Sequence, residues 1–412
     1  MTGNGSWLTE LALNRQDVDW RVQGDALIQY LRDEMPVFLT QSNWIPENLK
    51  ANSDHFTSYG HVLYSEELSS RLILGSFADG IHVLVETTLQ PSGEEELEPW
   101  KSAYDRAYRR LFEAEPEFSW WAAIGPHDGA GYVPKVTDGV TIKNIKVEPA
   151  GEPYTEGLDG RTNPHLAGAS FYSSYPLVAH GKTSGFNWES AATRTTRDLN
   201  AVCALFSLEF DSYWSIRNPI VPYDAENLDI ATIKLHKFAF GLSEENVRGA
   251  VLGNTRAVTV PSWIATAYGK LERNEILYSA VHSHQQGLAV EAEHPSLALI
   301  CFVSAIEGIG ASLEELSHCE HCGSHTGAQR RFRKALRTAL SAKEAKELQA
   351  VYTLRSETAH SGVLHGNETA MGNIFTPFTS FAGEPPGFSF RYRQLWKLKD
   401  ASKRVLIKHL SI

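Results

Sequence analysis

The stretch Glu347-Leu-Gln-Ala-Val-Tyr-Thr-Leu-Arg-Ser-Glu-Thr-Ala-His360 organises the second half of this chain. Read at helical spacing, it predicts an amphipathic helix. The breaker and turn residues that follow His360, Ser361-Gly362 first among them, predict that this helix ends just after it. Five residues share its packing face: Leu348, Val351, Tyr352, Arg355 and Ala359.

Two charged or titratable residues of this helix attract attention. Arg355 lies on or beside the packing face, where a lone charge is costly unless it is paired. His360 lies in the last turn, where the helix dipole favours a protonated imidazole. An arginine and a histidine placed in this way form a compact acid/base pair of the kind that phosphodiester cleavage needs. An Arg-x4-His spacing also arises by chance, so the surrounding sequence must show whether this pair is functional.

The context includes an apolar helix predicted over residues 297–310, about fifty residues upstream. Glu307 falls on its packing stripe, together with Ile300, Val303, Gly310 and Leu313. A half-buried glutamate on one helix and a half-buried arginine on another are natural partners. We therefore expect Glu307 to contact Arg355 and to orient it.

At this point the sequence resembles a family. The residues Ala305-Ile-Glu307, the basic helix Arg331-Phe-Arg-Lys-Ala-Leu336 and the motif Leu354-Arg-Ser-Glu-Thr-Ala-His360 with Gly362 look like a HEPN domain of the Apea-like branch. The resemblance covers roughly residues 261–412. It implies a compact helical domain that dimerises and brings two Arg-x4–6-His motifs together in a cleft. Family members with the motif are typically metal-independent endoribonucleases. Many carry Asn, His or Asp directly after the arginine, where this chain has Ser356.

The resemblance also implies roles for single residues. His360 would transfer protons, Arg355 would bind the phosphate, and Glu307 would complete the catalytic set. Ser356, Tyr352 and His365 would position the substrate, although Tyr352 and His365 fit a packing role equally well. The expected reaction is RNA cleavage by attack of the 2′-OH, and it needs no cofactor.

Charge is distributed unevenly along the chain. The 412 residues carry a net charge of −11, but residues 329–412 hold fifteen Lys/Arg and six Asp/Glu. The basic end therefore contains the Arg355/His360 motif, as expected of a domain that meets phosphates. A solvated helix face would give the same count, so charge alone leaves both interpretations open.

The predicted fold class is an α+β N-terminal domain followed by an all-α, HEPN-like helical bundle. Residues 1–222 form the first domain, 223–260 link the domains or complete the first one, and 261–412 form the bundle. Helices are expected at residues 17–35, 94–113, 188–214, 261–286, 297–310, 329–340 and 392–410, and in a motif helix opened by a capping box at Ser341-Ala-Lys-Glu344. Strands are expected at 37–39, 61–64, 71–74, 81–89, 140–147 and 171–178.

The location and partners follow from similar patterns. The N-terminus has no secretory signal, and no apolar run reaches the length of a membrane span, so a soluble, cytoplasmic protein without a membrane partner is expected. The expected partners are RNA and a second copy of the chain. By resemblance to defence and toxin proteins, the N-terminal domain is expected to sense a trigger, to bind an antitoxin or to select the substrate.

A cysteine- and histidine-rich segment links the two predicted helices 297–310 and 329–340. Cys319 and Cys322 have the spacing of two thiolates on one zinc ion, and His318 and His325 offer nitrogen ligands. A site of this kind would be structural, because thiolate-rich coordination leaves no open position for a substrate. The alternative is a polar loop with two reduced thiols.

Three functional hypotheses remain open on the sequence. The first is a homodimeric ribonuclease that acts through Arg355 and His360. The second is a non-catalytic HEPN-type protein, in which the bundle only dimerises or binds nucleic acid. The third is a different enzyme with its chemistry before residue 220, where no known catalytic motif is found.

Overall fold

The structure is a computed structural model of the whole chain, and it shows a mixed α+β protein. It divides into two compact units, of which unit 1 comprises Met1–Pro116 with Ser184–Asn187 and unit 2 comprises Glu117–Thr183 with Trp188–Ile412. The residues that the structure describes are 7–12, 20–34, 39–42, 61–65, 70–77, 80–87, 94–126, 133–150, 154–158, 170–174, 176–223, 236–238, 255–291, 293–313, 317–318, 325–366 and 390–411.

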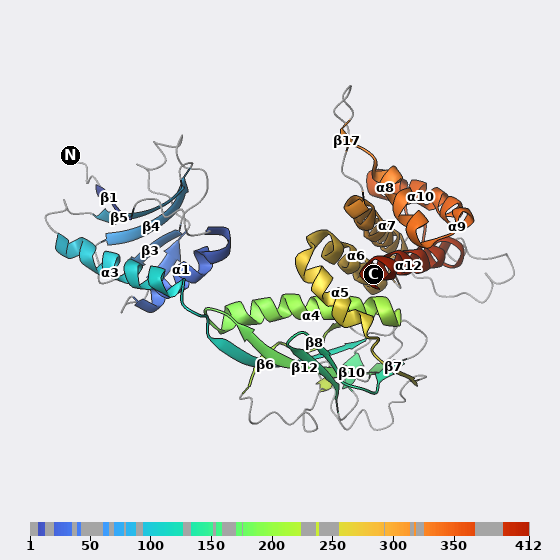
Figure 1. Cartoon of the computed structure of the whole chain (residues 1–412), viewed down its shortest axis with the longest axis horizontal. Helices are drawn as coiled ribbons and strands as arrows, with labels where there is room; N and C mark the ends of the chain where they lie inside the picture. The colour runs from blue at the N-terminus through green and yellow to red at the C-terminus, as the bar shows by residue number, and fades with distance from the viewer. Residues whose placement is uncertain are drawn as a thin grey trace. The chain divides into compact units, whose positions relative to one another are not determined.

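Unit 1 is an antiparallel sheet covered by two helices (Figure 1). Its strand order is β1-β5-β4-β3-β2, with β1 Trp7–Ala12, β2 Leu39–Ser42, β3 His61–Ser65, β4 Ser70–Phe77 and β5 Gly80–Thr87. Helices α1 (Trp20–Glu34) and α3 (Glu94–Arg110) pack against one face, where Leu72, Val83 and Val85 join Leu31 and Trp100 in one core. The strands β4 and β5 form a hairpin, with Phe77 paired to Gly80.

Unit 1 is completed by a segment from much later in the chain. The Gly185 amide donates to the Pro116 carbonyl at 3.1 Å. The Phe186 ring packs edge-on against Tyr30 of α1, with 6.0 Å between centroids. The chain therefore passes from unit 1 to unit 2 after Pro116, returns for Ser184–Asn187 and leaves again.

Unit 2 begins with a six-stranded sheet in the order β13-β6-β12-β9-β8, with β14 paired to β6. The strands are β6 Glu117–Pro126, β8 Val140–Ile142, β9 Ile145–Pro149, β12 Leu177–Ser184, β13 Trp214–Ile216 and β14 Val221–Pro222. The single strand predicted over residues 140–147 is instead the β8–β9 hairpin. Lys143 and Asn144 form its two-residue turn, and Lys143 has a positive φ of 57°, which tight hairpins require.

Five smaller strands form two further sheets. The strands β10 (Tyr154–Leu158), β11 (Ser170–Ser174) and β15 (His236–Phe238) form one small sheet, and β7 (Val133–Val136) pairs with β16 (Thr255–Val258). The strand predicted over residues 171–178 is therefore divided between β11 and β12. The region 223–260 contributes β15 and β16 to unit 2, so it completes that unit rather than only linking two domains.

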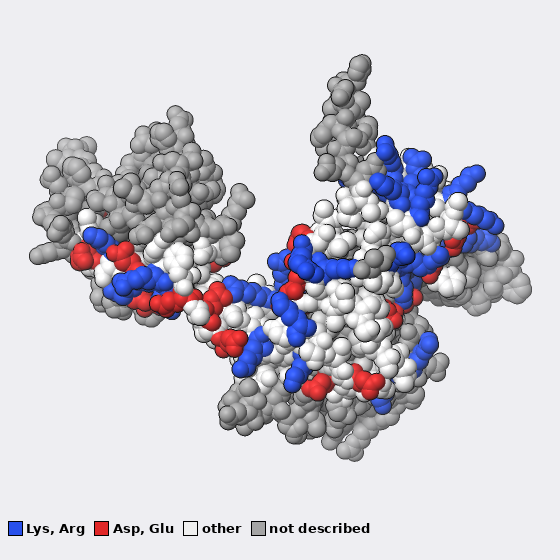
Figure 2. All heavy atoms as spheres, viewed as in Figure 1, with Lys and Arg blue, Asp and Glu red and all other residues white. Residues whose placement is uncertain are grey.

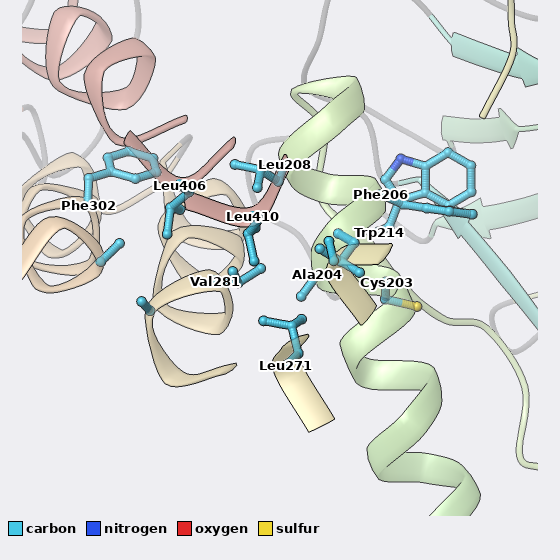
Figure 3. Close-up of a cluster of buried hydrophobic side chains, with 14 of the residues drawn as sticks. Cys203, Ala204, Phe206, Leu208, Trp214, Leu271, Val281, Phe302, Leu406 and Leu410 are labelled. Carbon is cyan, nitrogen blue, oxygen red and sulfur yellow. The ribbon is translucent and has the colours of Figure 1, made fainter. Parts of the chain in front are cut away.

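Helix α4 (Trp188–Phe210) joins the sheet to the helices that follow it (Figure 1). Phe206 and Trp214 of β13 lie together on one side, with ring centroids 5.3 Å apart. Figure 3 shows Ala204 and Leu208 on the other side, toward Val281 and Leu410. One continuous hydrophobic core therefore runs from the sheet through α4 into the helices. The domain boundary predicted at residue 222 falls inside this unit.

The described residues from Trp263 onward are mainly helical: α5 Trp263–Arg273, α6 Glu275–Val290, α7 Pro295–Leu313, α8 Ala328–Ala339, α9 Ala342–Glu347, α10 Gln349–Ser361, a π-helical turn η5 Arg391–Leu395 and α12 Trp396–Ser411. Its apolar residues place α7 in the middle, in contact with α6, α8, α10 and α12. Among the described helices, α7 alone has the length and apolarity of a membrane span. Half of that segment is buried inside the protein. The expectation that no apolar run reaches the length of a membrane span is wrong for α7, by length and composition.

Several predicted helices are interrupted. The helix predicted over residues 261–286 breaks at Asn274, whose side chain accepts from the amides of Ile276 and Leu277 and so begins α6. The capping box of Ser341 and Glu344 is present, but it opens the short α9, and the motif helix α10 follows after Leu348. The helix predicted over residues 188–214 ends at Phe210, where Asp211 has a positive φ of 54° and the chain turns into β13.

Candidate functional site

Helix α10 places Tyr352 and Arg355 toward the central helix α7. Leu348 and Val351 are buried and fix the side of α10 that packs. Tyr352 and Arg355 follow on the same side, one turn apart, because residues three positions apart are neighbours on a helix surface. α10 ends at Ser361, and Gly362 adopts the left-handed conformation (φ 66°) that terminates many helices. The predicted end of this helix is confirmed.

Glu307 of α7 receives both of these side chains. The Tyr352 hydroxyl donates to Glu307 Oε1 at 2.8 Å. Arg355 Nη2 lies 3.5 Å from Glu307 Oε2, and the side chains of Arg355 and Glu307 are 23% and 17% exposed. The predicted contact between Glu307 and Arg355 is therefore present, and it joins α7 to α10.

The two bonds to Glu307 differ in strength. A charge-assisted bond from arginine to a carboxylate is normally 2.7–2.9 Å long, so the contact of Arg355 is at the outer limit. Arg355 Nε is buried and has no hydrogen-bond partner among the described residues. Tyr352 is thus the main partner of Glu307, and the guanidinium keeps unused donors.

Burial and the neighbouring Glu307 carboxylate raise the pKa of Tyr352 to about 12. Burial disfavours the phenolate, and the hydrogen bond to a carboxylate favours the protonated hydroxyl. Tyr352 consequently remains a hydrogen-bond donor throughout the physiological range. Its ring also packs against Phe332 of α8, with centroids 5.3 Å apart, so a third helix holds this cluster.

His360 faces another direction from Arg355. The two residues are five positions apart, which places them about 140° apart around the axis of α10. His360 is exposed, and within the described part of the chain its side chain makes no hydrogen bond or ion pair. A single copy of the chain therefore presents the two motif residues on different faces of the helix.

His365 anchors the segment that follows α10. Its amide donates to Ser296 Oγ of α7 at 2.9 Å, and its Nε2 lies 3.2 Å from the Leu354 carbonyl. Its ring packs against that of Phe390, with centroids 5.8 Å apart. These contacts give His365 a packing role that the sequence left open. Ser356, next to Arg355, is partly exposed at the surface of α10.

Two residues of this region were not predicted from the sequence. Ser296 receives the amides of His365 and Gly366, and Phe332 supports Tyr352. An amphipathic pattern predicts that Phe332 is buried but not against which residue. For Ser296 the sequence carries no signal, because its partners lie about seventy residues away.

Cys319 and Cys322 lie outside the described residues. Only the backbone is described for His318 and His325, which pair with each other in the short strands β17 (Ser317–His318) and β18 (His325–Thr326). The ends of the cysteine-containing segment are therefore adjacent. The described residues contain no group of three or more metal-ligating side chains, and zinc binding here stays a prediction.

The surface near this cluster is basic. Figure 2 shows Lys and Arg gathered over the region of α8 and α9. α8 carries five Lys or Arg and no Asp or Glu. Positive charge thus lies on the helix that packs, through Phe332, against Tyr352.

Comparison of the chain with models of protein families, with curated protein sequences and with solved structures gave no match.

Proposed function

We propose that this protein is a metal-independent endoribonuclease whose helical part is a HEPN-like bundle. The observation that carries the proposal is that the hydrogen-bond donors of the Arg355 guanidinium are only partly used. Glu307 holds its guanidinium through one 3.5 Å contact, while Tyr352 takes the better bond to the same carboxylate. An arginine oriented in this way retains donors for a phosphate.

The chemistry assigns distinct roles to the two motif residues. The 2′-oxygen of one nucleotide attacks the adjacent phosphorus, and the bond from phosphorus to the 5′-oxygen breaks. A base takes the 2′-OH proton, an acid gives a proton to the leaving 5′-oxygen, and a cation stabilises the negative charge on the non-bridging phosphate oxygens. His360 transfers protons, Arg355 binds the phosphate, and Glu307 orients Arg355. The products are a 2′,3′-cyclic phosphate and a 5′-hydroxyl.

The proposal includes a homodimer. His360 and Arg355 diverge by about 140° on α10, so one copy does not present them to one phosphate. Two copies whose α10 helices face each other would supply a histidine and an arginine from different chains. Two histidines in such a composite site also supply both the acid and the base.

The remaining parts of the proposal rest on the resemblance. The reaction takes place in the cytoplasm, and the protein acts as a toxin or an antiviral defence effector. The N-terminal part senses a trigger, selects the RNA or binds an antitoxin. The zinc expected at Cys319 and Cys322 has no catalytic role.

A second candidate is a non-catalytic HEPN-type protein that dimerises or binds nucleic acid. The exposed position of His360, away from Arg355, favours it. In that case the contacts among Glu307, Tyr352 and Arg355 only tie α10 to α7.

Incubation of the purified chain with labelled RNA in EDTA separates these candidates. We expect cleavage by the parent chain and a loss of about a hundred- to ten-thousand-fold for His360→Ala. Arg355→Ala should lose a similar factor. It should also lose about 1–3 kcal/mol of stability, because Glu307 keeps only Tyr352 as a partner.

His294→Ala is the matched control, because His294 is an exposed histidine elsewhere in unit 2. It should cleave at the parent rate. If His360→Ala and Arg355→Ala, both shown to be folded, also cleave at the parent rate, the motif is structural. If the parent chain itself cleaves no RNA, the non-catalytic candidate stands.

A further inference from the structure

The exposed face of α8 is a stripe of positive charge. Arg330, Lys334 and Arg337 are exposed and fall within an arc of about 60° around the helix axis. The buried residues Phe332 and Leu336 lie on the opposite side. α8 contains no acidic residue that would neutralise the stripe, and Figure 2 shows the resulting basic surface.

The helix that carries the stripe is held rigidly beside the candidate site. The α7 backbone at Gly310 lies so close to α8 that a Cβ there would be 2.5 Å from the Arg331 carbonyl oxygen. Phe332, on the buried side of α8, contacts the Tyr352 ring. The stripe is therefore roughly one helix diameter, about 10–12 Å, from the cluster of Tyr352, Glu307 and Arg355.

The shape and chemistry of the stripe fit a phosphodiester backbone. From Arg330 to Arg337 the helix rises about 10 Å, so three cations follow one line. Two of the three are arginines, whose planar guanidinium binds phosphate in a bidentate manner. Lys334 also donates to the Leu313 carbonyl at 3.0 Å, which ties this exposed side chain to the end of α7.

A membrane surface fits less well. A helix that lies on a bilayer inserts its apolar face between the lipids. The apolar face of α8 is occupied by the protein core, where Phe332, Ala335 and Leu336 are fully buried. The exposed face of α8 is the charged one.

We propose that Arg330, Lys334 and Arg337 bind the phosphates of a single-stranded RNA next to the Arg355 site. This inference rests on the proposed function, because it assigns the surface that holds the substrate of that reaction. The contacts are to phosphates and carry no base specificity.

The test compares two triple variants in a His360→Ala background, in which the labelled RNA stays intact. The stripe variant is Arg330→Gln/Lys334→Gln/Arg337→Gln, in which glutamine keeps the helix propensity. The matched control, Lys101→Gln/Lys146→Gln/Lys408→Gln, removes the same charge from exposed positions of α3, β9 and α12. Circular dichroism confirms that both variants fold.

Fluorescence anisotropy of a labelled single-stranded RNA, in EDTA and at several salt concentrations, gives the dissociation constants. We expect the stripe variant to bind about ten- to a hundredfold more weakly at 0.1 M salt. The slope of log K against log salt should fall by about 2, since each lost phosphate contact contributes about 0.7. The control should retain both values.

Equal RNA affinity for the stripe variant and the control overturns the inference. Loss of binding to phosphatidylserine vesicles without loss of RNA binding also overturns it, in favour of a membrane. If the chain cleaves no RNA but the stripe variant binds RNA more weakly, the inference stands and the proposed function fails. If cleavage requires His360, and the stripe substitutions placed in the parent chain leave cleavage as fast as the control substitutions do, the proposed function stands and the inference fails.

Discussion

At the scale of single residues, His284 shows how strongly the core of unit 2 excludes charge. It is fully buried in α6, with Nδ1 3.0 Å from Ser402 Oγ and its ring 5.2 Å from that of Phe302. Burial, with smaller contributions from Lys403 and Lys399, lowers the pKa of His284 to about 3. The histidine is therefore neutral in the folded protein at any pH near neutrality.

This neutral histidine predicts how stability depends on pH. The folded pKa of His284 is lower than the value of 6.5 in an unfolded chain, so below pH 6.5 the unfolded chain takes up a proton that the folded chain refuses. Between pH 6 and 4, protonation of His284 in the unfolded chain should lower the free energy of unfolding by about 1.4 kcal/mol per pH unit. Urea titrations of the parent and of His284→Gln at several pH values measure this contribution.

The difference between the two chains isolates His284 from other titrating groups. The parent should be the more stable at pH 7, and its advantage should narrow as the pH falls. Parallel pH curves for the two chains would show that His284 is not held neutral in the core.

The contacts of Glu307 show how far the sequence predicts a site at this scale. Its position on the packing stripe of α7 predicts a buried carboxylate that needs a cationic partner, and Arg355 is in contact with it. The stronger bond from Tyr352 was not predicted, because helical spacing does not fix which hydroxyl points at which oxygen. The direction of His360 follows from the same spacing, since five positions turn a helix by about 140°.

At the scale of elements, close packing of α7 on α8 depends on Gly310. A Cβ on Gly310 would lie 2.5 Å from the Arg331 carbonyl oxygen, so α8 would have to move. We expect Gly310→Ala to lower the free energy of unfolding by about 1–3 kcal/mol, because overpacking is not relieved by a rigid backbone. Thermal and urea unfolding measure the change.

Gly269→Ala is a suitable comparison for this helix contact. Gly269 lies in α5, where an added Cβ meets only the end of the Arg273 side chain at 3.8 Å. Since alanine favours helix over glycine, this variant should be neutral or slightly stabilised. Equal stability of Gly310→Ala and Gly269→Ala would contradict the close approach of α8 to α7.

The predicted elements are more accurate in type than in extent. The capping box at Ser341 and the glycine after α10 were predicted because caps depend on local sequence. The turn at Lys143 was missed, because the apolar run on both sides of Lys143-Asn144 resembles one continuous strand. The break at Asn274 was missed for a similar reason, since the apolar helical pattern continues across it.

At the scale of the whole molecule, α4 explains why the domain boundary differs from the predicted one. Composition changes near residue 222, after a β-rich region and before the helices. α4 nevertheless buries residues on both sides, and the sheet and the helices share one core. The apolar residues of a helix predict that it is buried, but they do not predict how many other elements pack against it.

This shared core predicts which fragments of the chain fold. A fragment of residues 261–412 loses α4 and exposes Leu271, Val281 and Leu410, which belong to that core. We expect it to bind the dye ANS and to unfold without a cooperative transition. A fragment of residues 117–412 retains the sheet and α4 and should unfold cooperatively. Cooperative unfolding of fragment 261–412 without dye binding would contradict a shared core.

The return of Ser184–Asn187 to unit 1 affects how the protein folds during its synthesis on the ribosome. Unit 1 lacks these residues until residues 117–183 have been translated, which takes on the order of several seconds. During that interval the Pro116 carbonyl lacks the Gly185 amide, and Tyr30 lacks Phe186. The strands β6 to β12, already made, still await α4 and β13. The two units therefore mature in overlapping periods, and neither is finished before translation of the other has begun.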